Sequence, residues 1–461
     1  MKFILSILLL CSFTKIQASE HIDVEKFNWD GMDVVYLQDE RLPTYLVQFF
    51  FADGALADRP TKGGETEMMF ELLSRGTDQY DQKKLADFFE FYGVEFSSQT
   101  VHEYSTFAYS GLVKDIQETT KMVCHMFTNA TYPKEEISKY QVLISNQWKN
   151  LVINHGALAE RVFRQVSLAN TPYASATDGS SKTLLNITNE DLKAKNHYFN
   201  HSVKKRIYLT GPKKMLDGFK ETLSTNCGWQ NSQQAIVRGS PDDKNYVMLK
   251  KPMFYLVPVP KANQAQIKIG RYVTSSEVSN SDFNKQEYLG LVSEFLGGGF
   301  TSKLMQELRV KRGLTYSAGS TISLQKYYGR IVISTFTKNE TLKETLNVTK
   351  NVLVDVAQSN FDEKEVATII QNLSGSHPFK FEANKSFMQN LAFFDHIGKS
   401  YNDLYEFPNI IKKIKKQDIA RITQDAFNWN QQIILVVGDK ALESQLKELG
   451  EVQILNYKDY L

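Results

Sequence analysis

The chain of 461 residues repeats one order of predicted elements twice along its length. In the first half, an alternating strand pattern at residues 45–51 precedes a helical pattern at 65–73. In the second half, a similar strand at 265–273 precedes a helix that begins near residue 283 and runs into three consecutive glycines. Self-similarity on this scale predicts a tandem duplication of one structural unit.

The later elements keep the same order in both halves. A strand pattern at 104–112 follows the first helix, and strand patterns at 315–322 and 329–337 follow the second. Long amphipathic helices come next, at 115–128 and 342–358. Strands followed by helices predict two α+β domains, each with helices layered against a mostly antiparallel sheet.

The first 18 residues have the pattern of a secretory signal peptide. Lys2 supplies the positive start, residues 3–13 form an apolar run, and Ser19 would begin the mature chain. The run is too short to span a bilayer comfortably, so we expect export and no stable membrane insertion. The mature chain should be soluble, and periplasmic if the host is a bacterium.

A polar, turn-rich segment at 239–244 predicts a linker between the halves, with the boundary near residues 235–255. We therefore expect an N-terminal domain at 19–240 and a C-terminal domain at 255–461. The 54 basic and 52 acidic residues nearly balance, which argues against a nucleic-acid partner.

Two cysteines, Cys124 and Cys227, remain after removal of the signal peptide. They could pair in an exported protein. A large domain does not need such a cross-link, however, and we favour two unpaired thiols.

Residues 63–77 read G-G-E-T-E-M-M-F-E-L-L-S-R-G-T. This segment resembles the zinc-site helix of the pitrilysin/insulinase metallopeptidase family, G-x-x-H-x-x-E-H-x-L-x-x-G-T. In that inverted motif two histidines hold zinc and the glutamate between them is the general base. Here the histidine positions hold Glu67 and Glu71, and the base position holds Phe70. The resemblance implies that the frame of the motif is kept and its hydrolytic chemistry is lost.

The family's third zinc ligand is a glutamate about 75 residues later. That count ends at Asn146, with no carboxylate within two residues on either side. We therefore expect no metal and no other cofactor on this chain. An unorthodox metal site would need Glu67, Glu71 or distant histidines. His197 and His201 have helical spacing but no carboxylate between them, and His102-Glu103 falls in the strand after the degenerate helix.

Residues 296–317 read L-G-G-G-F-T-S-K-L-M-Q-E-L-R-V-K-R-G-L-T-Y-S. They resemble the second-domain signature of the same family, G-G-x-x-S-[RK]-L-x-x-x-[IL]-R-x-x-x-[GQ]-[LG]-x-Y. The resemblance implies that Arg309 and Tyr316 reach across a chamber to a zinc domain, hold the substrate backbone and stabilise the oxyanion. The seven-residue spacing favours Arg309 over Arg312 for this role. Alternatively, the signature is kept because it packs the domain.

Two further segments are candidates for substrate binding. Gly297, Gly298 and Gly299 permit close backbone approach or positive φ angles, which suits a substrate-contacting loop or a tight structural turn. Residues 96–100 stand where the family has an N-A-x-T edge strand that pairs with extended substrate, and only Thr100 matches.

A degenerate zinc motif in one half and a kept Arg/Tyr signature in the other resemble the non-catalytic subunit type of this family. The resemblance implies a heterodimer in which a homologous H-x-x-E-H subunit binds zinc and both subunits enclose peptide substrates. The alternative is a catalytically inert scaffold or peptide-binding homologue without an enzymatic role.

Overall fold

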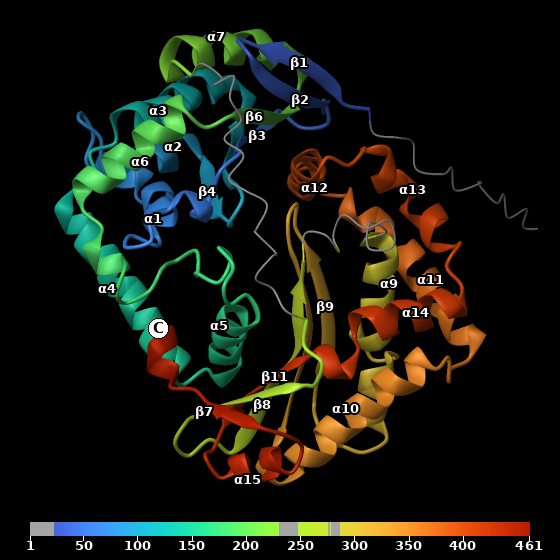
Figure 1. The fold of residues 1–461 in the computed structure, drawn as a ribbon. Helices are drawn as coiled ribbons and strands as arrows, with labels where there is room; N and C mark the ends of the chain where they lie inside the picture. Colours follow the sequence, from blue (N-terminus) through green and yellow to red (C-terminus); the bar gives the residue numbers. More distant parts are fainter. Residues whose placement is uncertain (1–22, 230–247, 275–276, 278–285) are drawn as a thin grey trace, which may run out of the picture.

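The computed structural model describes residues 23–229, 248–274, 277 and 286–461. Each half of the chain contributes one six-stranded sheet (Figure 1). The strands of the first sheet are β1 (Glu25–Trp29), β2 (Met32–Gln38), β3 (Thr44–Phe51), β4 (Glu95–Thr100), β5 (Ser105–Leu112) and β6 (Lys205–Gly211). The strands of the second sheet are β7 (Met253–Pro258), β8 (Gln264–Val273), β9 (Ala318–Leu324), β10 (Gly329–Lys338), β11 (Ile433–Gly438) and β12 (Val452–Ile454).

Five strands of each sheet share one topology. The order β2-β6-β3-β5-β4 in the first sheet corresponds to β7-β11-β8-β10-β9 in the second. The β2–β6 and β7–β11 pairs are parallel, and the three pairs that follow in each sheet are antiparallel. The expected class, two tandem α+β units with mostly antiparallel sheets, is confirmed. The same topology places β4 and β9 at equivalent edges.

Helices cover the sheets because their apolar faces match the buried faces of the strands. The helices of the first half are α1 (Glu65–Glu71), α2 (Gln82–Tyr92), α3 (Ile116–Asn129), α4 (Lys134–Leu151), α5 (His155–Ser167), α6 (Asn189–His201) and α7 (Leu216–Cys227). Those of the second are α9 (Gln286–Gly297), α10 (Leu342–Ala357), α11 (Glu363–Ser376), α12 (Asn384–Ile397), α13 (Asn402–Ile411), α14 (Lys416–Ala426) and α15 (Leu442–Lys447).

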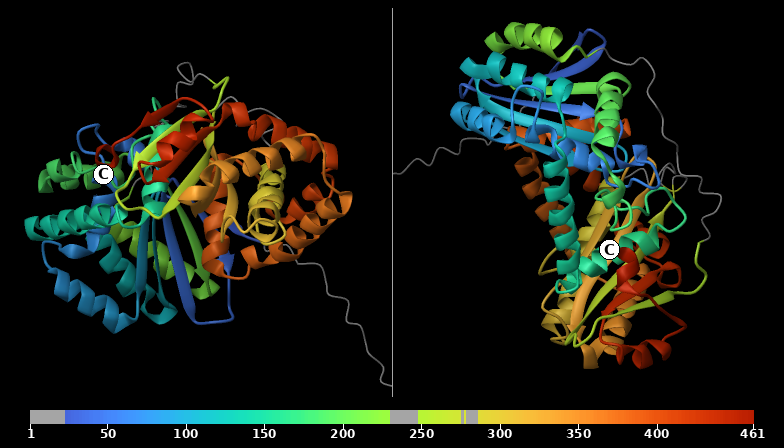
Figure 2. Two further views of the ribbon diagram at one scale, coloured as in Figure 1. Left: turned by 90° about the horizontal axis from the view of Figure 1, so that it is seen from below. Right: turned by 90° about the vertical axis from the view of Figure 1, so that its left-hand side faces the viewer.

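The two halves exchange one helix each. Helix α5 of the first half packs on the second sheet, where Val162 and Phe163 are buried against Leu435 and other strand residues. Helix α12 of the second half packs on the first sheet, where Leu391 is buried against Phe50. Figures 1 and 2 show α5 and α12 between the two halves. Each sheet therefore has one face covered by its own half and one by the other half.

Cys124 on α3 and Cys227 at the end of α7 form a disulfide, with their Cα atoms 4.6 Å apart. The expectation of two unpaired thiols is therefore wrong. The two helices pack side by side, which brings together residues 103 positions apart in the chain. Sequence spacing could not reveal this contact.

Two expectations concern residues outside the described ranges: the signal peptide at 1–18, and the linker segment at 239–244. The beginning of the helix expected near residue 283 also lies outside them, and the described helix begins at Gln286. Among the helices that the structure does describe, none combines the length and the apolarity that a bilayer-spanning helix needs.

Candidate functional site

The position of the family's general base is part of the hydrophobic core. Phe70 is 3% exposed on α1, and its ring centroid lies 5.2 Å from those of both Phe51 and Phe199. The ring centroid of Phe127, the fourth member of this aromatic cluster, lies 6.4 Å from that of Phe70. A residue in this position has no access to a substrate or a water molecule, so α1 has no group placed for general-base chemistry.

The two former ligand positions differ in environment. Glu71 is exposed, and its Oε1 accepts a hydrogen bond of 2.6 Å from the Ser98 hydroxyl of the edge strand β4. Glu67 is mostly buried and hydrogen-bonded to Thr177. Burial, and then the charge of Asp178, raise the pKa of Glu67 to about 7. A carboxyl that is half protonated at neutral pH is a weak ligand for a metal.

Residues 177–179 lie over the N-terminal half of α1. The Asp178 carboxylate accepts hydrogen bonds from the Trp148 indole at 2.7 Å and from Arg161 Nη1 at 2.9 Å. The backbone of residues 178 and 179 packs so closely on Gly63 and Gly64 that a Cβ at Gly64 would lie 2.9 Å from the carbonyl oxygen of Asp178. The degenerate helix is thus covered by the chain itself, which the sequence pattern did not indicate.

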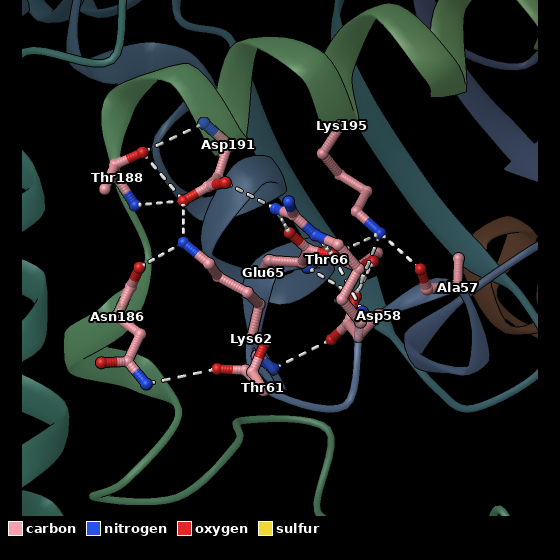
Figure 3. Close-up of polar contacts among 12 residues, drawn as sticks. Ala57, Asp58, Thr61, Lys62, Glu65, Thr66, Asn186, Thr188, Asp191 and Lys195 are labelled. Atoms are coloured by element: carbon pink, nitrogen blue, oxygen red, sulfur yellow. Dashed lines mark hydrogen bonds and ion pairs between the residues drawn. The ribbon is translucent and has the colours of Figure 1, made fainter.

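A buried ionic network fixes the N-terminus of α1 (Figure 3). Lys195 of α6 lies 2.9 Å from Glu65 and 3.5 Å from Asp58, and all three side chains are at least nine-tenths buried. Asp58 accepts hydrogen bonds from the backbone N–H groups of Gly64 and Thr66, so it caps the helix with a negative charge. Burial raises the pKa of Asp58 to about 6. Motif matching missed these residues, because Asp58 and Lys195 lie outside the zinc motif and Glu65 occupies a position that the motif leaves unspecified.

The remaining candidate metal ligands do not lie together in one site within the described part of the chain. Asn146 is exposed on α4, and His197 and His201 are exposed neighbours on α6 with ring centroids 4.3 Å apart. Within the described ranges, no group of three or more His, Cys, Asp or Glu side chains could hold a metal ion. His102 and Glu103 lie in the loop between β4 and β5, not in a strand as expected, because the hairpin turns there.

Arg309 and Tyr316 lie together at the surface of the second half. The guanidinium carbon of Arg309 is 4.2 Å from the ring centroid of Tyr316 and 4.8 Å from that of Phe300, so Arg309 contacts both aromatic rings. Tyr316 is 71% exposed and Phe300 is 67% exposed. A cation and a phenol are thus presented to solvent on one patch, which we call the Arg/Tyr patch (Phe300, Arg309 and Tyr316).

Local structure on both sides holds the Arg/Tyr patch in place. Arg309 lies in a π-helical turn, η7 (Met305–Val310), a rare feature that is frequent at functional sites. The segment that carries Tyr316 is fastened to β10, because Thr337 donates to the Leu314 carbonyl at 2.7 Å and Thr335 donates to the Ser317 carbonyl at 2.9 Å.

The neighbouring Arg312 is already engaged in an ion pair with Glu307. Of the two arginines, Arg309 is therefore the one that stacks on Tyr316.

Of the three consecutive glycines, Gly297 is needed for packing against the second sheet. A Cβ at Gly297 would lie 2.3 Å from the Ser320 nitrogen, so only glycine lets α9 approach β9 this closely. The alternative of positive φ angles is wrong for Gly297, Gly298 and Gly299, since none of them has one. Thr100 lies elsewhere, at the end of β4, where it lines a cavity between the halves.

Comparisons with known proteins agree with this geometry. Residues 33–176 match the family model of insulinase, peptidase family M16, and residues 229–373 match that of the peptidase M16 inactive domain. Between them the two matches cover more than half of the chain. The chain belongs to the insulinase (M16) family, and with its zinc ligands and base replaced it is an inactive member.

Among curated relatives, the non-peptidase homolog YmxG of Helicobacter pylori is 21% identical over 445 residues, which cover 95% of this chain and 99% of that protein. The uncharacterized zinc protease YmxG of Bacillus subtilis is 18% identical over 88% of this chain and 96% of that protein.

Two solved structures share the fold. The peptidase M16 inactive domain from Pseudomonas fluorescens has a TM-score of 0.79 and 20% identity, and the match covers 91% of this chain and 98% of that one. The first half of the periplasmic protease PqqL from Escherichia coli has a TM-score of 0.69 and 12% identity, with 94% and 98% covered. At these identities the likeness concerns the fold alone.

Proposed function

We propose that this chain is the non-catalytic subunit of a heterodimeric zinc peptidase. Its partner would be a homologous subunit with an intact H-x-x-E-H motif, and the substrates would be peptides enclosed between the two. The observation that carries the proposal is the Arg/Tyr patch. The half-buried Arg309 and the exposed Tyr316 form one unit at the surface of a chain whose own zinc helix has lost its ligands and its base.

The chemistry of the Arg/Tyr patch suits peptide hydrolysis in trans. The Arg309 guanidinium offers forked donors to substrate carbonyl groups, and the Tyr316 hydroxyl can donate a hydrogen bond to a developing oxyanion. Zinc bound in the partner would polarise the scissile carbonyl and activate water. Stacking on Phe300 and Tyr316 limits the conformations of the Arg309 side chain. Little conformational entropy is therefore lost when Arg309 binds the substrate.

The closure of the degenerate helix supports a division of labour. Phe70 lies in the core and residues 177–179 lie over α1, so the first half of the chain would help to enclose the substrate without taking part in the hydrolysis. The edge strand β4 could still pair with an extended peptide, since backbone hydrogen bonds do not depend on side-chain identity. The bounds 19–240 and 255–461 for the two domains belong to the same proposal.

Export from the cytoplasm is also part of the proposal. The Cys124–Cys227 disulfide favours an oxidising compartment, where such bonds form and persist. The signal-like pattern of residues 1–18 points the same way.

The test is reconstitution with a quenched peptide substrate. Three samples are compared: this chain without residues 1–18, the closest H-x-x-E-H homologue of the same host, and their equimolar mixture. We expect hydrolysis in the mixture only, and an Arg309→Ala chain should lower the rate of the mixture at least about tenfold. A homologue that is fully active alone and indifferent to this chain would contradict the proposal. That result would favour the inert scaffold or peptide-binding homologue instead.

A further inference from the structure

A cavity of about 530 Å³ lies between the two halves, apart from the Arg/Tyr patch. Its walls come from α4 and α5, from the loop after β4, and from the β9–β10 hairpin. The volume falls within the range of small-molecule sites. Apolar surface comes from Trp148, Leu151 and Tyr328, and the polar lining includes arginines and carboxylates.

The carboxylates in the walls are already hydrogen-bonded to other groups. Each accepts hydrogen bonds of 2.7–2.9 Å from at least two donors. The sets are Asp178 with Trp148 and Arg161, Glu160 with Lys268 and Arg330, and Glu103 with Tyr173 and His396. Their charges are therefore largely satisfied within the chain.

Arg164 differs from the other cations of the cavity. Its guanidinium is partly buried, yet no carboxylate or carbonyl in the described part of the chain accepts a hydrogen bond from it. Burial, and then the positive charge of Arg330, lower the pKa of Arg164, and both arginines line the cavity. Arg330 Nη1 and Thr100 Oγ1 are also buried without a hydrogen-bond partner among the described atoms.

We propose that this cavity binds the carboxylate of a small ligand with an apolar body. The carboxylate would lie between Arg164 and Arg330, where it would cancel their repulsion and accept hydrogen bonds from both. The apolar body would lie against Trp148, Leu151 and Tyr328. A free organic acid and the C-terminal residue of a short peptide share this chemistry. The inference does not depend on a partner subunit, because every group belongs to this chain.

Binding is tested by calorimetry on the whole chain without residues 1–18. The probes are N-acetyl-Ala-Phe as the free acid, its C-terminal amide, and 3-phenylpropanoate. We expect saturable binding of the peptide acid. The amide should bind at least about tenfold more weakly than the acid, because it lacks the negative charge that the two arginines require. If 3-phenylpropanoate binds as well, a free organic acid suffices as the ligand. If only the peptide acid binds, the ligand is a peptide C-terminus.

Variants of Arg164 complete the test. Arg164→Gln should weaken binding of the acid by roughly tenfold or more, and Arg164→Lys should be intermediate because it keeps the charge without the fork. The matched control is Arg421→Gln, on α14 outside the cavity, which should bind like the unaltered chain. Equal affinity for acid and amide, no saturable binding of any acid, or unchanged binding by folded Arg164→Gln would each overturn the proposal. Should Arg164→Gln not fold, the acid–amide comparison and Arg164→Lys decide.

Discussion

The guanidinium carbon of Arg309 lies 4.2 Å from the ring centroid of Tyr316, so the two side chains form one cation–π unit at the surface. The two residues come from different elements, a π-helical turn and the segment that leads into β9. Because the contact is between the guanidinium and the ring, the phenol hydroxyl stays available to another molecule. Arg309→Ala, which removes the cation, and Tyr316→Phe, which removes only the hydroxyl, should therefore differ in their effects.

Tyr316→Phe should remove the hydroxyl and keep the stack. In the reconstituted complex we expect the turnover number to fall about 10²–10³-fold, since one oxyanion donor is lost, with little change in KM. Thermal unfolding of the isolated chain should stay the same, because Tyr316 is 71% exposed. Steady-state kinetics on the mixture provide the measurement, with Tyr92→Phe on α2 as the control. An unchanged turnover number would mean that the hydroxyl does not act in the reaction.

Phe70 should stabilise the fold strongly, and a single substitution at this position should not restore a catalytic role. Phe70→Ala should lower the free energy of unfolding by about 3–5 kcal/mol, because it opens a cavity among Phe51, Phe127 and Phe199. Phe70→Glu should be worse, since it buries an unpaired charge, and should give no peptidase activity. Urea unfolding measures both. Phe91→Ala is the control, because Phe91 is 81% exposed. A Phe70→Glu chain as stable as the parent would show that this position is open to water.

Glu67 should make the fold less stable as the pH rises through neutrality. Its pKa is raised from 4.5 to about 7 in the folded chain, so the folded state holds the proton where the unfolded state has released it. This contribution is complete below the unfolded pKa and is lost as the pH rises through about 7. We expect Glu67→Gln to raise the free energy of unfolding at pH 8 by about 1–3 kcal/mol, and by less at pH 5.

Urea unfolding of the Glu67→Gln chain at several pH values gives the measurement. The matched control is Glu71→Gln, one turn further along α1 and exposed, which should change stability by less than about 0.5 kcal/mol. A Glu67→Gln effect that is the same at pH 5 and pH 8 would show that Glu67 does not titrate in this range.

The Cys124–Cys227 disulfide should contribute a large share of the stability. It closes a loop of about 100 residues, and in the chain-entropy model such a loop corresponds to about 4–5 kcal/mol. The double variant Cys124→Ser and Cys227→Ser should unfold at a correspondingly lower urea concentration, as should the parent chain under reducing conditions. If reduction leaves the parent unchanged, the bond does not stabilise the fold.

Local sequence was sufficient for the element order and the degenerate site. The strand at 45–51 was readable because its alternation matches a sheet with one face against α1 and α3, and β3 (Thr44–Phe51) lies there. Glu67, Phe70 and Glu71 were identified because motif spacing survives the loss of the ligands. The Arg/Tyr signature brought Arg309 and Tyr316 to notice for the same reason, although their stacking on each other was not predicted.

Contacts between distant segments could not be read in this way. The disulfide depends on α3 packing beside α7, and the cover over α1 depends on Asp178 meeting Trp148 and Arg161. In each contact, the local sequence around one residue does not indicate which distant residue it will meet. The same holds for His102 and Glu103, whose loop is defined by the hairpin and by Glu103 accepting a hydrogen bond from His396 in the other half.

The sequence by itself determined the duplication, the lost zinc chemistry and the kept Arg/Tyr signature, because these depend on residue type and spacing. Only the tertiary structure decided that α5 and α12 exchange places and that a cavity with Arg164 and Arg330 forms between the halves. The physical reason is that an apolar face reveals that it will be buried but not which element will bury it. That choice is made by packing, which is a property of the whole chain.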